Sequence, residues 1–107
     1  MIDWVRVADL RSEVGEDSFA EVIELFLEET DEVAARLRRG SGGSLRDDMH
    51  FLKGSALNLG FRDLAALCQE GERRAAAGAA VDLAAVLDCY ARSRDAFHAG
   101  LRRRPAA

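Results

Sequence analysis

The sequence predicts an all-α fold, an antiparallel four-helix bundle with a short additional N-terminal helix, on three observations. Apolar residues recur at spacings of three and four along most of the chain, as they do on one face of an α-helix. Apolar and polar residues nowhere alternate as in a half-buried strand, and Pro105 is the only proline. Glycine, serine and aspartate separate the periodic stretches by short links, and short links make consecutive helices antiparallel.

The chain has 107 residues, and we expect a single domain over residues 1–107 with one modest core. Its residues are 49% apolar and 32% charged, which is typical of a globular protein rather than a disordered one. No apolar run approaches the roughly 18 residues of a membrane span. The start, Met-Ile-Asp-Trp, lacks the basic and apolar pattern of a signal peptide. We therefore expect a cytoplasmic protein without a membrane partner.

The first helix is expected to be short, with Asp3 as its N-cap, and to lie across one end of the bundle. The second helix is expected to begin near Asp17 or Ser18, because Ser18 and Glu21 have the spacing of a capping box. Its predicted core stripe is Phe19, Val22, Ile23, Phe26, Thr30, Val33 and Leu37. Leu25 falls among the acidic residues of the outer face instead. Either the first helix covers it or it is exposed for a partner.

The stretch 40–43, Gly-Ser-Gly-Gly, is predicted to be a flexible connection. It is not a phosphate-binding loop, because no Gly-Lys-Ser/Thr follows it and no strand precedes it. Ser44 caps the third helix, which ends at Gly60. A fourth helix is predicted over residues 61–77, and Asp82 caps the last one. The inward residues are predicted to be Phe61, Leu64, Cys68, Gly71 and Ala75 in the fourth helix and Leu83, Val86, Leu87, Tyr90, Phe97 and Leu101 in the last.

The third helix carries the stretch that organises the chain, MHFLKGSALNLGF at residues 49–61. Its apolar stripe is Leu45, Met49, Leu52, Ala56 and Leu59. At about 100° per residue, His50 lies about 140° from the start of that stripe, so its imidazole points outward. Lys53 lies beside it and Gly54 one turn below. Glycine inside a helix costs roughly 1 kcal/mol relative to alanine, so we expect Gly54 to serve something other than helix stability.

The run HFLKGSALNLGF resembles the signature of the histidine-containing phosphotransfer (HPt) domain, and the likeness extends more loosely over most of the chain. The signature is a histidine, a lysine three residues on, a glycine four residues on, a small residue and then Leu-Gly. The resemblance implies that His50 is the phosphoacceptor, that Lys53 neutralises charge and that Gly54 gives clearance to the donor. An exposed neutral imidazole is nucleophilic, and phosphoryl transfer needs mainly positioning and charge neutralisation.

The resemblance also implies partners: the receiver domains of response regulators and a hybrid sensor histidine kinase. Among residues around the motif, we expect Arg46, Leu57 and Glu72 to contribute to partner docking. Glu72 stands where the family often has Glu or Gln near the acceptor histidine. It either bonds the other ring nitrogen of His50 or is an ordinary surface glutamate. Gly71 stands where we expect a larger apolar residue, although glycine there permits close helix approach.

The chain carries no recognisable metal cage or nucleotide site, so we expect no cofactor of its own and Mg²⁺ supplied by the partner receiver. We expect a phosphocarrier without autokinase activity, since a kinase needs an additional ATP-binding domain, and a monomer. Cys68 and Cys89 lack metal spacing and are interpreted as buried free thiols. His98 lacks the lysine and glycine that accompany His50, and we interpret it as an ordinary histidine.

Two other functions remain open at this point. One is a helical adaptor that binds receiver domains without being phosphorylated. The other is a module that binds nucleic acid through the basic end at residues 102–104, against which the net charge of −4 argues. The basic end is otherwise a solvated helix terminus that complements the helix dipole.

Overall fold

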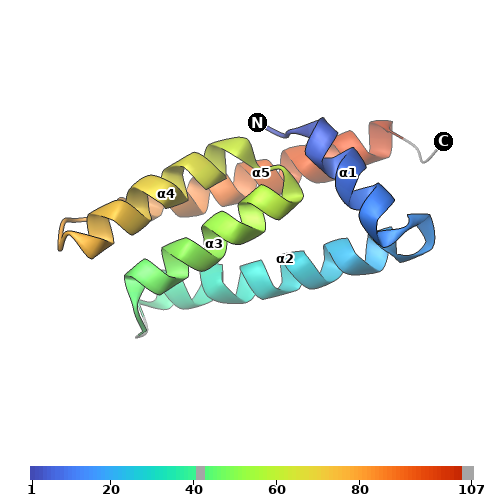
Figure 1. Cartoon of the computed structure of the whole chain (residues 1–107). Helices are drawn as coiled ribbons and strands as arrows, with labels where there is room; N and C mark the ends of the chain where they lie inside the picture. The colour runs from blue at the N-terminus through green and yellow to red at the C-terminus, as the bar shows by residue number, and fades with distance from the viewer. Residues whose placement is uncertain (41–42, 105–107) are drawn as a thin grey trace.

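The computed structural model describes residues 1–40 and 43–104, and in these it confirms the predicted helical bundle with five α-helices (Figure 1). The helices are α1 (Trp4–Val14), α2 (Glu16–Arg39), α3 (Leu45–Leu59), α4 (Arg62–Ala76) and α5 (Leu83–Arg103). α2 to α5 run alternately up and down in an elongated bundle, with overall extents of 47 × 21 × 21 Å. α1 crosses one end of the bundle, from the α3–α4 turn to the start of α2.

Three of the predicted helix caps are present. Asp3, Ser44 and Asp82 each precede a helix, and the side chain of each accepts a hydrogen bond from a backbone N–H of the first turn. Gly60 ends α3 in the left-handed region, with φ 76° and ψ 23°. Residues 41–42 of the predicted connection at 40–43 lie outside the described residues.

The second helix begins earlier than predicted, and the capping-box prediction was wrong. α2 starts at Glu16, directly after Gly15, which has φ 86° and makes no side-chain cap. Ser18 therefore lies in the first turn, where its backbone N–H donates to the carbonyl of Gly15. Because one glycine turns the chain from α1 into α2, no separate capping residue fits between them. Glu16 and Asp17 in the first turn complement the helix dipole instead.

The buried face of α2 is broader than the predicted stripe. Leu27 and Ala34 are also buried, and Leu27 borders a hollow between α2 and α5. Three predicted stripe residues are only half-buried: Val22, Phe26 and Leu37. The reason is that α2 packs against both α3 and α5, so neighbours on two sides widen the buried arc.

Aromatic rings join the short first helix to the core. Phe61 and Phe97 are fully buried and meet edge to face, with ring centroids 5.4 Å apart. Trp4 of α1 stacks on Phe97 at 6.0 Å. The predicted free thiols are confirmed, and burial, with a smaller effect of neighbouring Cys89, raises the pKa of Cys68 to about 12.

α3 and α4 approach closely where Gly71 faces Met49. A Cβ atom built at Gly71 would lie 2.8 Å from Sδ of Met49, closer than real Cβ contacts. The prediction that Gly71 permits close helix approach is therefore confirmed. Gly71 directly precedes Glu72, so this contact brings the carboxylate of Glu72 to the helix that carries His50.

The start of the chain is tied to the end of α3. Ile2 forms an isolated antiparallel bridge with Phe61, and the N–H of Asp3 donates to the carbonyl of Gly60 at 2.7 Å. A Cβ atom at Gly60 would lie 2.6 Å from the carbonyl oxygen of Asp3. Gly60 is thus required both by its positive φ and by this close approach of backbone.

We predict that Gly60→Ala lowers the free energy of unfolding by about 1–3 kcal/mol, because alanine is strained at positive φ and collides with the Asp3 carbonyl. Urea unfolding followed by circular dichroism at 222 nm measures the change. Gly54→Ala is the matched control: it places the same methyl group in a helix interior with open space around it and is expected to stabilise by about 1 kcal/mol. Equal stability of Gly60→Ala and the parent protein would contradict the prediction.

Candidate functional site

His50 lies on the outer face of α3, with its side chain 69% exposed. The residues of α3 that are buried are Asp48, Met49, Leu52, Ser55, Ala56 and Leu59. They lie on the opposite side of the helix, so α3 is anchored in the core while the imidazole reaches solvent. This is the orientation that the helical spacing predicted.

Glu72 of α4 contacts both His50 and Lys53. Its Oε2 lies 2.9 Å from Nδ1 of His50, and Nζ of Lys53 donates to its Oε1 at 2.6 Å. The hydrogen bond from Lys53, and after it that from His50, holds the pKa of Glu72 below its ordinary value of 4.5. The carboxylate is therefore ionised at neutral pH, with both oxygens engaged.

This contact determines which nitrogen of the His50 ring carries the proton. An ionised carboxylate only accepts hydrogen bonds, so Nδ1 must carry a hydrogen in order to bond to Glu72. In the neutral imidazole the other nitrogen, Nε2, is then unprotonated and presents its lone pair. The geometry thus leaves a nucleophilic nitrogen on a ring that is largely open to solvent.

Lys53 and Gly54 complete the surroundings of the imidazole. The side chain of Lys53 is 22% exposed, and its contact with Glu72 uses one of the three donors of its ammonium group. Beyond its chain neighbours and its own helix backbone, no atom of the described residues lies within 4 Å of a Cβ built at Gly54. A positive charge therefore lies near the ring, and the surface one turn below is open.

The residues predicted for docking lie around this group. Arg46 is exposed at the start of α3, and Leu57 is 59% exposed one turn beyond Lys53. Leu57 shares a hollow with Ala65 and Arg62 of α4. Glu72 differs from these two, because its carboxylate is bound to His50 and Lys53 and so faces the imidazole rather than the surrounding surface.

Two exposed apolar side chains, one on α3 and one on α2, were not assigned to the site by the sequence. Phe51 follows His50 and is 36% exposed, and Leu25 of α2 is 54% exposed. The helical spacing of Phe51, about 100° from His50, indicates an outward residue. It does not indicate which helix lies alongside.

The described residues contain no group of three or more histidines, cysteines, aspartates and glutamates placed to hold a metal ion. None of their helices is both long enough and apolar enough to span a membrane.

The comparison with protein families shows to which family the chain belongs. The family model for the Hpt domain matches residues 21–96, which is more than half of the chain and includes His50, Lys53 and Glu72. The chain belongs to the Hpt domain family. Membership indicates involvement in the phosphotransfer of two-component phosphorelays, and Hpt domains are in general phosphocarriers rather than kinases. No curated protein and no solved structure matches the chain.

The family assignment confirms the resemblance that the motif suggested, and it implies that this Hpt domain interacts with receiver domains and kinases. The candidate site consists of three side chains from two helices: His50 and Lys53 of α3 and Glu72 of α4. Since Glu72 comes from α4, the correct pairing of α3 with α4 is needed to build it.

We predict that Glu72→Ala changes the tautomer of the His50 ring. In the parent Hpt domain at neutral pH, ¹⁵N NMR of the imidazoles is expected to show the neutral ring of His50 protonated at Nδ1, because only that form bonds to Glu72. In Glu72→Ala the signals are expected to move toward a mixture of the two tautomers. Glu72→Gln, whose amide oxygen still accepts a hydrogen bond, is expected to keep the parent pattern.

His98 on α5 serves as the internal control, and its signals are expected to be the same in all three proteins. Unchanged His50 signals in Glu72→Ala would show that the carboxylate does not set the tautomer.

Proposed function

We propose that this Hpt domain accepts a phosphoryl group on Nε2 of His50 from the phosphorylated aspartate of one receiver domain and passes it to another receiver. The observation that carries the proposal is the exposed ring of His50, held through Nδ1 by Glu72 with its other nitrogen unprotonated. A nucleophile whose orientation is fixed in advance loses less entropy on reaching the transition state.

In the proposed step, the lone pair of Nε2 attacks the phosphorus of the acyl phosphate. The bond between phosphorus and the aspartate oxygen breaks, and the receiver carboxylate leaves with the electron pair. The proton on Nδ1 stays in place, so the ring becomes positively charged as the N–P bond forms. The ionised Glu72, which accepts the hydrogen bond from Nδ1, stabilises that charge. The reverse sequence returns the group to a second receiver aspartate.

Lys53 contributes charge to the same step. Its ammonium keeps two donors beyond the one given to Glu72, and these can bond to the oxygens of the incoming phosphoryl group. We propose that the receiver supplies Mg²⁺ for the remaining negative charge, so this chain brings no cofactor. Phosphoryl transfer of this kind needs positioning and electrostatic stabilisation rather than covalent machinery.

We further propose that the domain works without autokinase activity and receives its phosphoryl group ultimately from a hybrid sensor histidine kinase. Arg46 and Leu57 belong to the surface that the receiver covers, because both are exposed on α3 within two turns of His50.

The test is transfer from a purified receiver domain carrying labelled phosphate, in the presence of Mg²⁺. We expect acid-labile, alkali-stable label on the Hpt domain, and complete loss of that label in His50→Gln. His98→Gln is the matched control and should be labelled like the parent protein. Label that persists in His50→Gln would overturn the assignment of the acceptor.

The same assay separates the alternative functions. Receiver binding without any label on the Hpt domain would favour an adaptor. Binding to DNA with a steep dependence on salt, together with no transfer, would favour a nucleic-acid module.

We predict that Gly54→Leu blocks transfer from a receiver while leaving the chemistry of His50 intact. A leucine there occupies the open surface one turn below the imidazole, so the transfer rate is expected to fall by about 10- to 100-fold. Phosphoramidate is a small donor that transfers its phosphoryl group to histidine with loss of ammonia. It should label Gly54→Leu and the parent protein equally. An unchanged rate from the receiver would remove the clearance role of Gly54.

A further inference from the structure

A hollow lies between α1 and the end of α5, at the end of the bundle that α1 crosses. Its volume is about 170 Å³, which suits a ligand smaller than the usual drug-sized molecule. The residues that line it are Trp4, Val7, Ala8, Arg11, Leu101 and Arg104. Four of these are apolar and two are arginines, and no acidic residue is among them. We call this cavity the Trp4 hollow.

Trp4 forms a fixed wall of this hollow. Its ring is stacked on Phe97 of α5, with ring centroids 6.0 Å apart and an angle of 10° between the ring planes. A Cβ atom built at Gly100 would collide with the Trp4 ring, so the ring fits against bare backbone. Because two residues of α5 hold the ring in this way, the hollow is formed before a ligand arrives, and binding costs less entropy.

The guanidinium of Arg104 lies over the ring of Trp4, with its Cζ 4.4 Å from the ring centroid. A cation–π contact uses the face of the guanidinium and leaves the N–H groups at its edge. Within the described residues the Arg104 side chain forms no ion pair and donates no hydrogen bond. Its donors are therefore available to an anion in the hollow.

Arg11 of α1 is held in the same manner from the other side. Its Cζ lies 4.4 Å from the centroid of the Phe19 ring on α2. Oε2 of Glu16 lies 3.6 Å from its Nε, which is too far for a hydrogen bond, and that Nε is buried without a hydrogen-bond partner among the described residues. The Glu16 side chain is 55% exposed, so this ion pair neutralises Arg11 only weakly.

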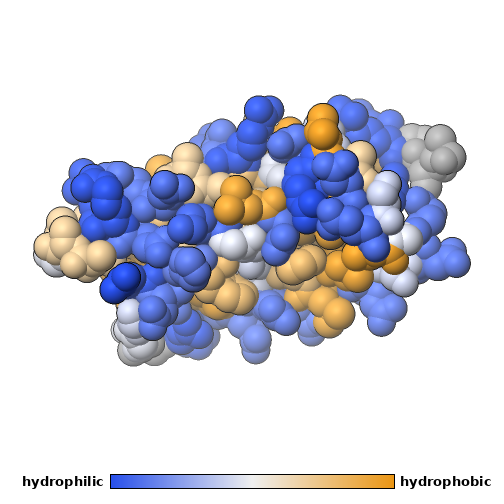
Figure 2. All heavy atoms as spheres, in the orientation of Figure 1, coloured by the Kyte–Doolittle hydropathy of each residue, from blue (hydrophilic) through white to orange (hydrophobic). Residues whose placement is uncertain are grey.

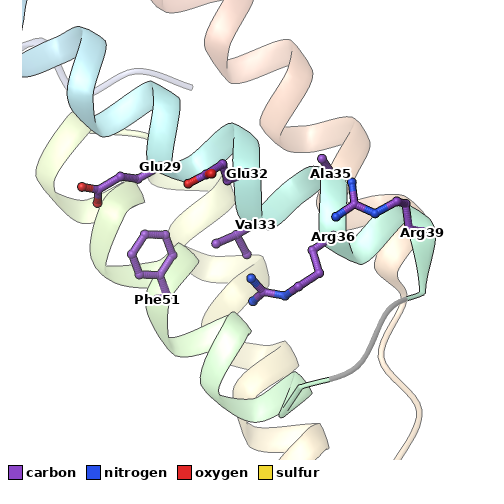
Figure 3. A pocket seen from close by; sticks show the side chains of 7 residues that line it. All are labelled: Glu29, Glu32, Val33, Ala35, Arg36, Arg39 and Phe51. Carbon is purple, nitrogen blue, oxygen red and sulfur yellow. The ribbon is translucent and has the colours of Figure 1, made fainter.

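Other parts of the surface differ from the Trp4 hollow in charge or in depth. The groove between α2 and α3 beside Phe51 carries both signs of charge, because Glu29 and Glu32 line it together with two arginines (Figure 3). Leu25 is 54% exposed, so the first helix does not cover it. Figure 2 shows hydrophobic spheres scattered among hydrophilic ones over the face that it displays. The Trp4 hollow instead combines apolar walls with positive charge alone.

We propose that the Trp4 hollow binds a small carboxylate with an apolar body, such as an aromatic or short aliphatic acid. The carboxylate group is bound by the guanidinium groups of Arg11 and Arg104, and the apolar body lies against Trp4 and Leu101. The flat edge of a guanidinium matches the two oxygens of a carboxylate, which favours this group over a spherical anion. The apolar walls offer such a body an environment without water. This site is separate from His50, and the inference goes beyond the proposed function.

The experiment measures the binding of benzoate and of hexanoate to the purified protein by isothermal titration calorimetry. For ligands of about eight or nine heavy atoms, we expect a dissociation constant of about 0.1–1 mM. Acetate carries the charge without the apolar body, and benzyl alcohol carries an apolar body without the charge. Each of these is expected to bind at least about tenfold more weakly. In ¹H–¹⁵N NMR spectra, the indole N–H of Trp4 is expected to shift when benzoate or hexanoate binds.

Three variants test the named residues. Arg104→Gln and Arg11→Gln each remove one cation, and Ala8→Phe fills the hollow from an exposed position without changing its charge. We expect each to weaken binding about tenfold or more. The matched control is Arg103→Gln, which removes the same charge from an exposed residue that does not line the hollow. It should bind within about twofold of the parent protein, and circular dichroism checks that all variants are folded.

Three results would overturn the inference. The first is that neither benzoate nor hexanoate binds the parent protein at about 10 mM, well above the expected dissociation constant. The second is that acetate binds as tightly as they do, or that Arg103→Gln loses as much affinity as Arg104→Gln, because either would indicate a general attraction to the basic end of the chain. The third is unchanged binding in both Ala8→Phe and Arg104→Gln, which would place the ligand elsewhere.

Discussion

The bond between Glu72 and His50 is the interaction on which the rest of the site depends. It joins α3 to α4 across the outer surface of the bundle, and Lys53 shares the same carboxylate. One turn-length of α4 beside this bond packs closely on α3: a Cβ built at Gly71, the residue before Glu72, would lie 2.8 Å from Sδ of Met49. The packing of α3 on α4 thus places the carboxylate of Glu72 within reach of a ring that is exposed to solvent.

The remainder of the fold keeps α3 in place. The first three residues bind the turn that follows it, and Arg36 bonds to Asp48 near its beginning. Both ends of the helix are thus fixed to other elements, while its middle carries the exposed histidine. The imidazole is therefore held on a helix that is anchored at both of its ends.

Much of this organisation could be predicted from the chain alone, because helical periodicity has a direct physical meaning. The spacing of Leu45, Met49 and Leu52 gave the buried face of α3, and with it the outward direction of His50. The start of α2 was missed, since a capping box and a single-glycine turn compete at the same place and only the turn fits. Phe51 was missed because a wheel indicates an outward residue but not its neighbouring helix. The groove beside it depends on how α2 and α3 pair.

Trp4 has a further consequence. It is the single tryptophan of the chain, and its ring is stacked on Phe97 of α5. The guanidinium of Arg104, the residue after α5, lies 4.4 Å from the centroid of the Trp4 ring. The ring therefore lies at the junction between the first and last helices, at the end of the bundle that α1 crosses. Its intrinsic fluorescence therefore reports on whether α1 is packed against α5, without an added dye.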